Sequence, residues 1–366
     1  MATTALVVAA AFAMSGTALA KSKSKAKPAS LKITGNILAG FGAIDDDENG
    51  SNGRHVSFDV YSDSEIHFKG SATLANGIKI GATMELQGAV YDSTNADETH
   101  LNISGGFGKL ELGAQDNAAK NMVGGYLGSG AVGVGISTHL GVNKWIDLPS
   151  GHAASANNPI DVGSDNDKIS YYTPRMSGLA VGVSYSPSAT SADTPAALSD
   201  GIHTIYAVAA TFDRKMGNAS FGIAAGYTNG HESGGTDHGH PAVWGAGFKV
   251  DYDKIRVSAG VTHEWNRSAE TATTDAGDLS HDFGIKYTMD KNNSFSLGYV
   301  KVTDQALRSN TNDDETEIGV LAYQRALGKG VAYRLSFAWA EYEGEVDGTS
   351  DDNDGIALIN EVKLSF

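Results

Sequence analysis

Alternation of polar and apolar residues is the feature of this sequence that most constrains its fold. From Glu65 to Leu74, polar and apolar side chains follow each other with a period of two. The dipeptide Asn76-Gly77 comes next, and the segment from Ile78 to Gln87 then resumes the alternation. A period of two is typical of a β-strand with one polar and one apolar face, and Asn-Gly between two such segments indicates a tight, two-residue hairpin turn. The chain is therefore predicted to contain antiparallel hairpins.

The same unit recurs along the chain and predicts sixteen strands in total. The predicted strands are Leu31–Phe41, Glu65–Leu74, Ile78–Gln87, Leu101–Phe107, Leu110–Ala114, Ile169–Thr173, Leu179–Tyr185, His203–Phe212, Ala219–Tyr227, Ala242–Tyr252, Ile255–Trp265, Leu279–Met289, Ser294–Val302, Ile318–Arg325, Val331–Tyr342 and Ile356–Phe366. Every second connection is a short turn, whereas the others are long, polar and acidic. Short turns at one rim and long loops at the other are typical of outer-membrane β-barrels.

The polar faces of the predicted strands separate a membrane barrel from a soluble β-sandwich. They carry charged side chains such as Lys79, Glu85 and Arg334. A dry core would not accept these charges unpaired, whereas a water-filled lumen accepts them readily. No apolar run after residue 20 reaches the length of a membrane-spanning helix, which excludes a helical membrane protein. We therefore expect an all-β fold, a 16-stranded antiparallel transmembrane β-barrel, which is wide enough to leave an aqueous channel.

Composition narrows the function classes. The net charge of −16 argues against nucleic acid as a partner, because phosphate binding needs a basic surface. The chain has no cysteine, which suits a protein that crosses an oxidising compartment without needing disulfides. Its 45 glycines and 7 prolines fit neither a disordered chain nor a helical enzyme.

The N-terminal region is predicted to be a targeting segment. Residues 5–20 are small and apolar and end in Ala18-Leu19-Ala20, which matches a signal-peptidase site. We expect residues 1–20 to be a signal peptide, 21–30 a short basic segment, and 31–366 the transmembrane barrel. Export through a cleaved signal peptide to the bacterial outer membrane follows from this organisation.

Several segments share a pattern of strand and turn residues: Glu65-Ile66-His67-Phe68-Lys69-Gly70, the Asn76-Gly77 turn, Gly105-Gly106-Phe107-Gly108-Lys109-Leu110-Glu111-Leu112-Gly113, Ile169-Ser170-Tyr171-Tyr172-Thr173-Pro174, Gly178-Leu179-Ala180-Val181-Gly182-Val183-Ser184-Tyr185 and the terminal Phe366. With these segments the chain resembles the general-diffusion porins of Gram-negative bacteria, most closely the alphaproteobacterial type. The resemblance covers the whole mature chain. It implies a homotrimer, a third long loop folded into the lumen, and a terminal aromatic, Phe366, that the barrel-assembly machinery reads. Its partners would be outer-membrane lipid and lipopolysaccharide.

One connection, from Gln115 to about Asp167, is much longer than the others. A loop of this length in a compact fold is usually functional. It follows the fifth predicted strand, where the porin resemblance implies a constriction loop, so we assign residues 116–167 to that role. The chain lacks the Pro-Glu-Phe-x-Gly signature that the enteric porins carry there, and its counterpart is the glycine-rich segment 124–135.

Charged residues of this loop and of the early strands are the candidates for lining and narrowing the pore. They are His67, Lys69, Glu85 and His100 on the strands and Asp116, Asp147, Asp161 and Asp165 in the loop. Opposed charges across a narrow bore create a transverse field that screens solutes by charge. The acidic excess predicts a mild cation preference. The alternative is that each of these residues is a solvated charge without a specific role.

Two sets of loop residues suggest metal binding. The acidic outer loops can hold Ca²⁺ or Mg²⁺, or can form a solvated repulsive rim. His231, Asp237, His238 and His240 are weak candidates for Zn²⁺ or Cu²⁺, because they satisfy no fixed ligand spacing. No cofactor is otherwise predicted, and no nucleophile–base spacing indicates an enzyme. The predicted function is a passive, water-filled channel for small hydrophilic solutes and ions; the alternative is a barrel that mainly binds divalent metal or a surface partner.

Overall fold

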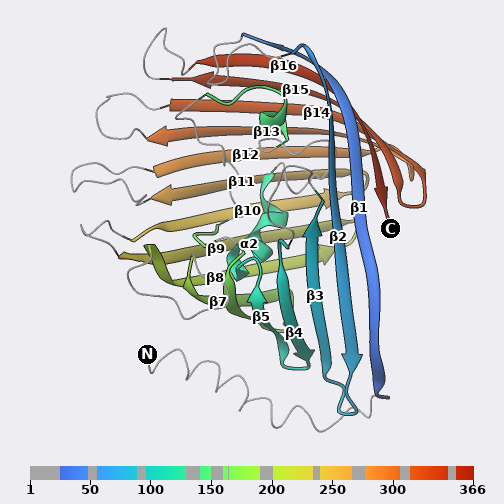
Figure 1. The fold of residues 1–366 in the computed structure, drawn as a ribbon, viewed down its shortest axis with the longest axis vertical. Helices are drawn as coiled ribbons and strands as arrows, with labels where there is room; N and C mark the ends of the chain where they lie inside the picture. The colour runs from blue at the N-terminus through green and yellow to red at the C-terminus, as the bar shows by residue number, and fades with distance from the viewer. Residues whose placement is uncertain are drawn as a thin grey trace.

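Sixteen strands form one closed antiparallel barrel in the computed structural model (Figure 1). The structure describes residues 25–47, 56–88, 96–128, 141–149, 160–163, 165–189, 201–233, 240–265, 277–305, 314–344 and 352–366. Each strand pairs with its neighbours in the sequence, and the first pairs with the last, which closes the sheet. Closure removes the open sheet edges whose backbone groups lipid cannot hydrogen-bond.

Each of the sixteen predicted strands is present, which confirms the predicted fold class. The strands are β1 (Lys27–Asp46), β2 (Phe58–Thr73), β3 (Lys79–Gln87), β4 (Thr99–Gly105), β5 (Gly108–Ala114), β6 (Asp167–Tyr172), β7 (Leu179–Ser188), β8 (Gly201–Met216), β9 (Ala219–Ser233), β10 (Ala242–Tyr252), β11 (Ile255–Trp265), β12 (Gly277–Thr288), β13 (Asn293–Gln305), β14 (Asp314–Gly328), β15 (Val331–Glu343) and β16 (Asn353–Ser365). Because β1 begins at Lys27, the end of the basic segment 21–30 is already part of the barrel. The predicted signal peptide lies outside the described residues.

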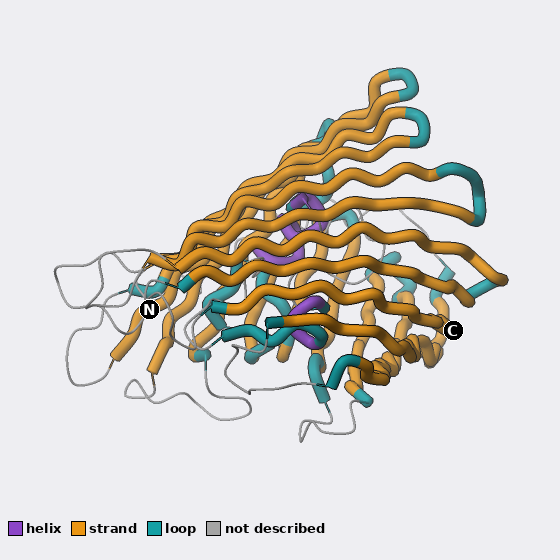
Figure 2. Tube along the Cα trace, turned by 90° about the horizontal axis from the view of Figure 1, so that it is seen from above, coloured by secondary structure: helices purple, strands orange, loops and turns teal. Residues whose placement is uncertain are grey.

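The short connections gather at one end of the barrel (Figure 2). The turn between β2 and β3 contains three residues, Ala75 to Gly77, rather than the two that Asn76-Gly77 suggests. The backbone N–H of Leu74 donates to Ile78 O at 2.8 Å, and that of Gly77 donates to Leu74 O at 2.9 Å. Gly77 has φ 88°, a conformation that glycine adopts without steric strain and that is typical of three-residue hairpin loops.

The outer face of the barrel is apolar. Along β16, the outward residues Ile356, Leu358, Val362 and Leu364 are each 45–49% exposed. Residues on the opposite face of the same strand, such as Ile359, are buried. An exposed apolar surface that encircles a protein is far larger than a monomeric soluble protein tolerates, and lipid is the solvent that it suits.

No helix in the described part of the chain is long and apolar enough to cross a membrane.

The described parts of the long connection between β5 and β6 lie inside the barrel and include short helices. These are the helix α2 (Ala118–Val123) and the 3-10 helices η1 (Gly124–Tyr126) and η2 (Val142–Lys144). Figure 2 shows the helical segments enclosed by the strands. The predicted folding of the third loop into the lumen is therefore confirmed.

Candidate constriction site

The first part of the long loop packs against the inner wall formed by β7 to β12. Ala119, Val123 and Leu127 are buried against the small side chains of Ala207 and Ala224. Where η1 crosses β10, a Cβ on Gly247 would collide with the main-chain carbonyl of Tyr126. Small residues on these strands therefore allow the loop to lie directly on the wall. Under α2 and η1 the inner face is therefore lined largely by small residues, in addition to the charged residues that the strand pattern predicted for the lumen.

Hydrogen bonds fix the start of α2 to the wall. Asn117 caps the helix, since its Oδ1 accepts from the Lys120 backbone N–H at 2.9 Å. Its Nδ2 donates to Ile160 O at 3.0 Å, which ties the two ends of the loop together. The Ala118 N–H donates to Ser184 Oγ on β7 at 2.7 Å. Asn117 and Ser184 are both buried, and a buried polar contact of this kind fixes the position of the helix.

The second part of the loop packs on a different wall. Val142, Trp145 and Ile146 are buried in a cluster with residues of β14, β15 and β16. The Trp145 ring meets the Tyr61 ring edge-on, with centroids 5.2 Å apart, and it lies over Gly42, where a Cβ would come within 2.6 Å of the ring. The backbone here is held by Asn353, whose Nδ2 donates to Asp147 O at 2.8 Å. The loop therefore contacts two separate walls of the barrel.

Three carboxylates and one lysine meet at the base of the loop. Asp116, Asp165 and Glu98 each offer an oxygen within 4.8 Å of the others. Lys120 forms an ion pair with Asp116, and its Nζ lies 4.0 Å from Asp165 Oδ1. Glu98 accepts a hydrogen bond from the Asp116 backbone N–H at 3.2 Å. The structure thus brings together Asp116 and Asp165, which were predicted as site residues. Glu98 and Lys120 belong to the same cluster but were not predicted.

Burial and mutual repulsion shift the pKa values of this cluster. Burial, followed by the negative charge of Asp116, raises the pKa of Glu98 to about 7. Burial, together with the neighbouring Asp116, also raises the pKa of Asp165. Burial acts to lower the pKa of Lys120, but Asp116 and Asp165 outweigh it and raise that pKa. Glu98 therefore changes its charge near neutral pH, while Lys120 stays cationic.

The other two acidic loop residues lie elsewhere. Asp161 is close to α2, where its Oδ1 accepts from Asn117 Nδ2 at 2.7 Å and from the Gly163 N–H at 3.0 Å. Burial raises the pKa of Asp161. Asp147 lies on the opposite wall, where its backbone N–H is 3.4 Å from Asp46 Oδ2. The four acids therefore do not form one group.

The strand residues predicted to line the pore lie on β2, β3 and β4. His67 and Glu85 face each other across the β2–β3 pair, and the His67 Nδ1 lies 2.6 Å from Glu85 Oε1. Lys69 is 46% exposed, with its Nζ 4.0 Å from the same oxygen. His100 lies nearer the loop, where its Nδ1 is 3.7 Å from Glu98 Oε2. In the strand order, β2 and β3 are half-way round the closed barrel from β10 and β11, on which η1 packs.

A group of basic side chains near the short-turn end was not predicted as part of the site. Arg175 pairs with Asp213 at 2.5 Å, and Arg256 pairs with Asp251 at 2.6 Å. The Lys249 ammonium lies 3.7 Å from the centroid of the Tyr126 ring, a cation–π contact with the loop. Lys249 and Arg256 lie on the polar faces of predicted strands, and Arg175 lies between the predicted strands Ile169–Thr173 and Leu179–Tyr185; the sequence offers no other signal for this group.

Comparison with known proteins identifies the family. A family model described as "Gram-negative porin" matches residues 2–345. The chain belongs to this porin family. No curated protein matches the sequence. The family and the barrel place this porin in the outer membrane as a channel protein.

Solved structures of porins share the fold of this chain at low identity. An anion-selective porin from Comamonas acidovorans is 16% identical, with 93% of this chain and 100% of that chain covered and a TM-score of 0.67. OmpF of Salmonella typhi, in complex with daunomycin, is 11% identical, with 92% and 97% covered and a TM-score of 0.61. A trimer form of OmpT, an outer-membrane protein of Vibrio cholerae, is 8% identical, with 93% and 100% covered and a TM-score of 0.61. These likenesses bear on the fold alone.

The histidines of this porin that were weak metal candidates lie at the long-loop rim. His231 Nδ1 and His240 Nδ1 are 3.0 Å apart, and the ring of His203 on β8 meets that of His231 with centroids 4.9 Å apart. Asp237 and His238 lie outside the described residues. The family match favours a channel over a barrel that mainly binds metal or a surface partner.

Proposed function

We propose that this porin is a passive, water-filled channel for small hydrophilic solutes and ions, with a mild preference for cations. The observation that carries the proposal is a loop that packs on two separate walls inside a closed barrel. Sixteen strands enclose an aqueous bore, and a loop held across it narrows the bore. Solutes then diffuse down their gradients, limited by size and charge, with no covalent step and no cofactor.

Charged side chains in the lumen support the selectivity part of the proposal. At the base of the loop, Glu98, Asp116 and Asp165 outnumber their nearest cation, Lys120. On β2 and β3, the half-exposed Lys69 faces the lumen beside Glu85. The acidic loop base and the candidate pore-lining residues Asp147 and Asp161 together favour the passage of cations. Positive and negative side chains that face each other in the lumen orient water and polar solutes.

Further proposals complete this function. We propose that residues 1–20 are removed as a signal peptide and that the mature porin is a homotrimer, as one similar structure is described. Phe366 is proposed as the assembly signal. Its backbone hydrogen-bonds to that of Gly35 at 3.0 Å, and the residue is 52% exposed. Contacts with lipopolysaccharide, with Ca²⁺ or Mg²⁺ shared at the acidic outer loops, belong to the same proposal.

Planar-bilayer recording tests the channel directly. We expect stable conductance steps from protein purified from outer membranes. Small neutral sugars should enter the pore and lower the conductance, and sugars above a sharp size limit should leave it unchanged, because the loop narrows the bore. A barrel that inserts into bilayers but gives no aqueous conductance would contradict the proposal.

The charge selectivity is expected to depend on pH through Glu98. Its pKa of about 7 means that the side chain is mostly neutral at pH 6 and ionised at pH 8. Reversal potentials in a KCl gradient should therefore show a cation preference that rises, on the order of two-fold, as the pH increases through this range. Glu98→Gln keeps an oxygen for the Asp116 N–H and removes the charge, so it should abolish the rise. Anion selectivity at pH 8, or an unchanged pH response in the variant, would show that the proposal is wrong.

A further inference from the structure

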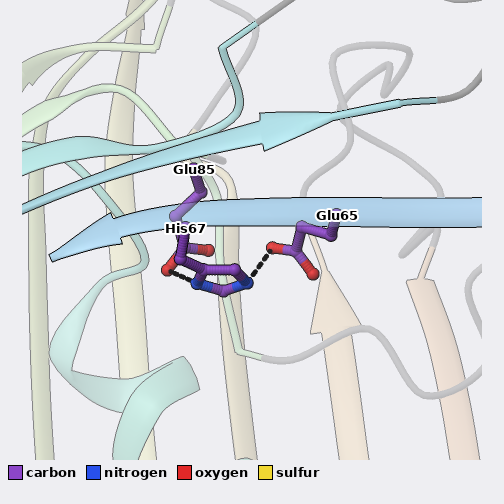
Figure 3. Close-up of side chains that lie close together, drawn as sticks. All are labelled: Glu65, His67 and Glu85. Carbon is purple, nitrogen blue, oxygen red and sulfur yellow. Dashed lines mark ion pairs between the residues drawn. The ribbon is translucent and has the colours of Figure 1, made fainter. Parts of the chain in front are cut away.

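A histidine and two glutamates converge on the inner wall of β2 and β3. Glu65 and His67 are two positions apart on β2, so they lie on the same face of the strand. Glu85 is the direct cross-strand partner of His67. One nitrogen of the ring and one oxygen of each carboxylate lie within 4.8 Å of one another (Figure 3). Strand pairing alone fixes this arrangement, since each side chain comes from the regular part of a strand.

The contacts of the ring do not suit a neutral imidazole. Its Nε2 lies 3.1 Å from Glu65 Oε1 and its Nδ1 lies 2.6 Å from Glu85 Oε1. A neutral imidazole has one N–H and one lone pair, so one of these two contacts would set a lone pair against a carboxylate oxygen. His67 Nδ1 is moreover buried and has no hydrogen bond of acceptable geometry. The cluster therefore has room for one more proton or for a metal ion between the ring and the two carboxylates.

We propose that Glu65, His67 and Glu85 form a binding site for a divalent transition-metal ion of the Zn²⁺ type. One imidazole and two carboxylates are common protein ligands of such ions. Ligand atoms around a tetrahedral ion with bonds of about 2.1 Å lie roughly 3.4 Å apart. The 3.1 Å between His67 Nε2 and Glu65 Oε1 is already close to that separation. Glu85 contacts the other ring nitrogen, Nδ1, at 2.6 Å, so it must rotate towards Nε2 to share the ion.

The surroundings of the site set its affinity. The three side chains are only partly buried, at 31% exposed for Glu65, 17% for His67 and 16% for Glu85. Water therefore completes the coordination, and the ion enters from the lumen. Lys69 Nζ lies 4.0 Å from Glu85 Oε1 and competes with the ion for that carboxylate. The site adjoins the acidic cluster at the loop base, since the Glu85 backbone N–H donates to Glu98 O at 2.8 Å, but the two groups share no ligand. Its existence does not depend on conduction through the pore.

Metal binding to the purified, folded barrel in detergent tests the inference. Isothermal titration with Zn²⁺ should show one ion per chain with micromolar affinity, and Co²⁺ should give the visible spectrum of a tetrahedral site. His67→Ala and Glu85→Gln should each weaken binding by at least about ten-fold, whereas Lys69→Gln should strengthen it. His100→Ala is the matched control, because His100 lies on the same wall with Glu98 alone at 3.7 Å, and it should bind Zn²⁺ like the unaltered protein.

Two results would overturn the inference. One is the absence of Zn²⁺ binding by a barrel that is folded, as judged by its strand circular dichroism and its migration on unheated gels. The other is equal binding by the unaltered protein and His67→Ala, with loss of binding in a His231→Ala/His240→Ala variant instead. The latter would place the metal at the rim. Because binding is measured without a membrane, a failed conductance experiment would leave these outcomes unaffected.

Discussion

Replacing Ile146 by aspartate is expected to release the second part of the long loop from its wall and to widen the channel. Ile146 is fully buried in the cluster with β14, β15 and β16. An unpaired carboxylate in that cluster costs several kcal/mol, which exceeds what the apolar contacts of a short segment supply. The barrel itself should persist, because its strand pairing does not depend on the loop.

The measurement is single-channel conductance with graded neutral sugars. Without the obstruction we expect the conductance to increase on the order of two-fold and larger sugars to enter the bore. Ile146→Val is the matched control: it removes one methylene, costs about 0.5–1.5 kcal/mol and should leave the loop in place. If Ile146→Asp kept the conductance and size limit of the unaltered protein in a folded barrel, the loop would not be the constriction.

Placing arginine at Leu321 is expected to destabilise the barrel strongly in a bilayer. Leu321 is in the middle of β14, 52% exposed on the outer face, with Leu297 and Phe337 as its cross-strand partners. If this face meets lipid, a cation at the midplane costs about 2–4 kcal/mol.

Leu327→Arg provides the internal control for this effect. Leu327 lies near the short-turn end of β14, at a register irregularity between Ala326 and Gly328, and it is 58% exposed. Arginine near the membrane interface costs only about 0–1 kcal/mol, since its charged group reaches water. Denaturant unfolding of both variants in phospholipid vesicles gives the two free energies. Equal effects at the two positions would mean that the outer face of β14 is not embedded in lipid.

The candidate site was only partly predictable from the sequence. Asp116 and Asp165 were predicted as site residues, and they meet at the loop base. Asp147 belongs to the same loop but lies on the opposite wall, because its segment packs on β14 to β16. Glu98 lies outside the loop and enters the cluster because β4 pairs with β5 as far as Thr99 and Ala114. Extending the predicted strand that begins at Leu101 back by three residues, to Glu98, was the step that could have found it.

The turn between β2 and β3 shows how much depends on one residue. With a two-residue turn, the register would set His67 opposite Leu86, and the face of every β3 side chain relative to β2 would be reversed. The three-residue loop pairs His67 with Glu85 instead, which creates the metal-site geometry. Asn76-Gly77 predicted the hairpin correctly but not the length of its turn. Two-residue and three-residue hairpin loops both favour asparagine and glycine, so these residues do not distinguish them.

The sequence by itself determined the number of strands, their order and which side chains share a face. These follow from a period of two and from turn residues, and both act between neighbours in the chain. Only the tertiary structure decided the cross-strand register, the walls on which the loop packs and the partners with which each charged side chain interacts. Those features arise from contacts between residues as far apart as Tyr342 and Asn143, whose side chains meet at 2.9 Å, and no local pattern encodes them.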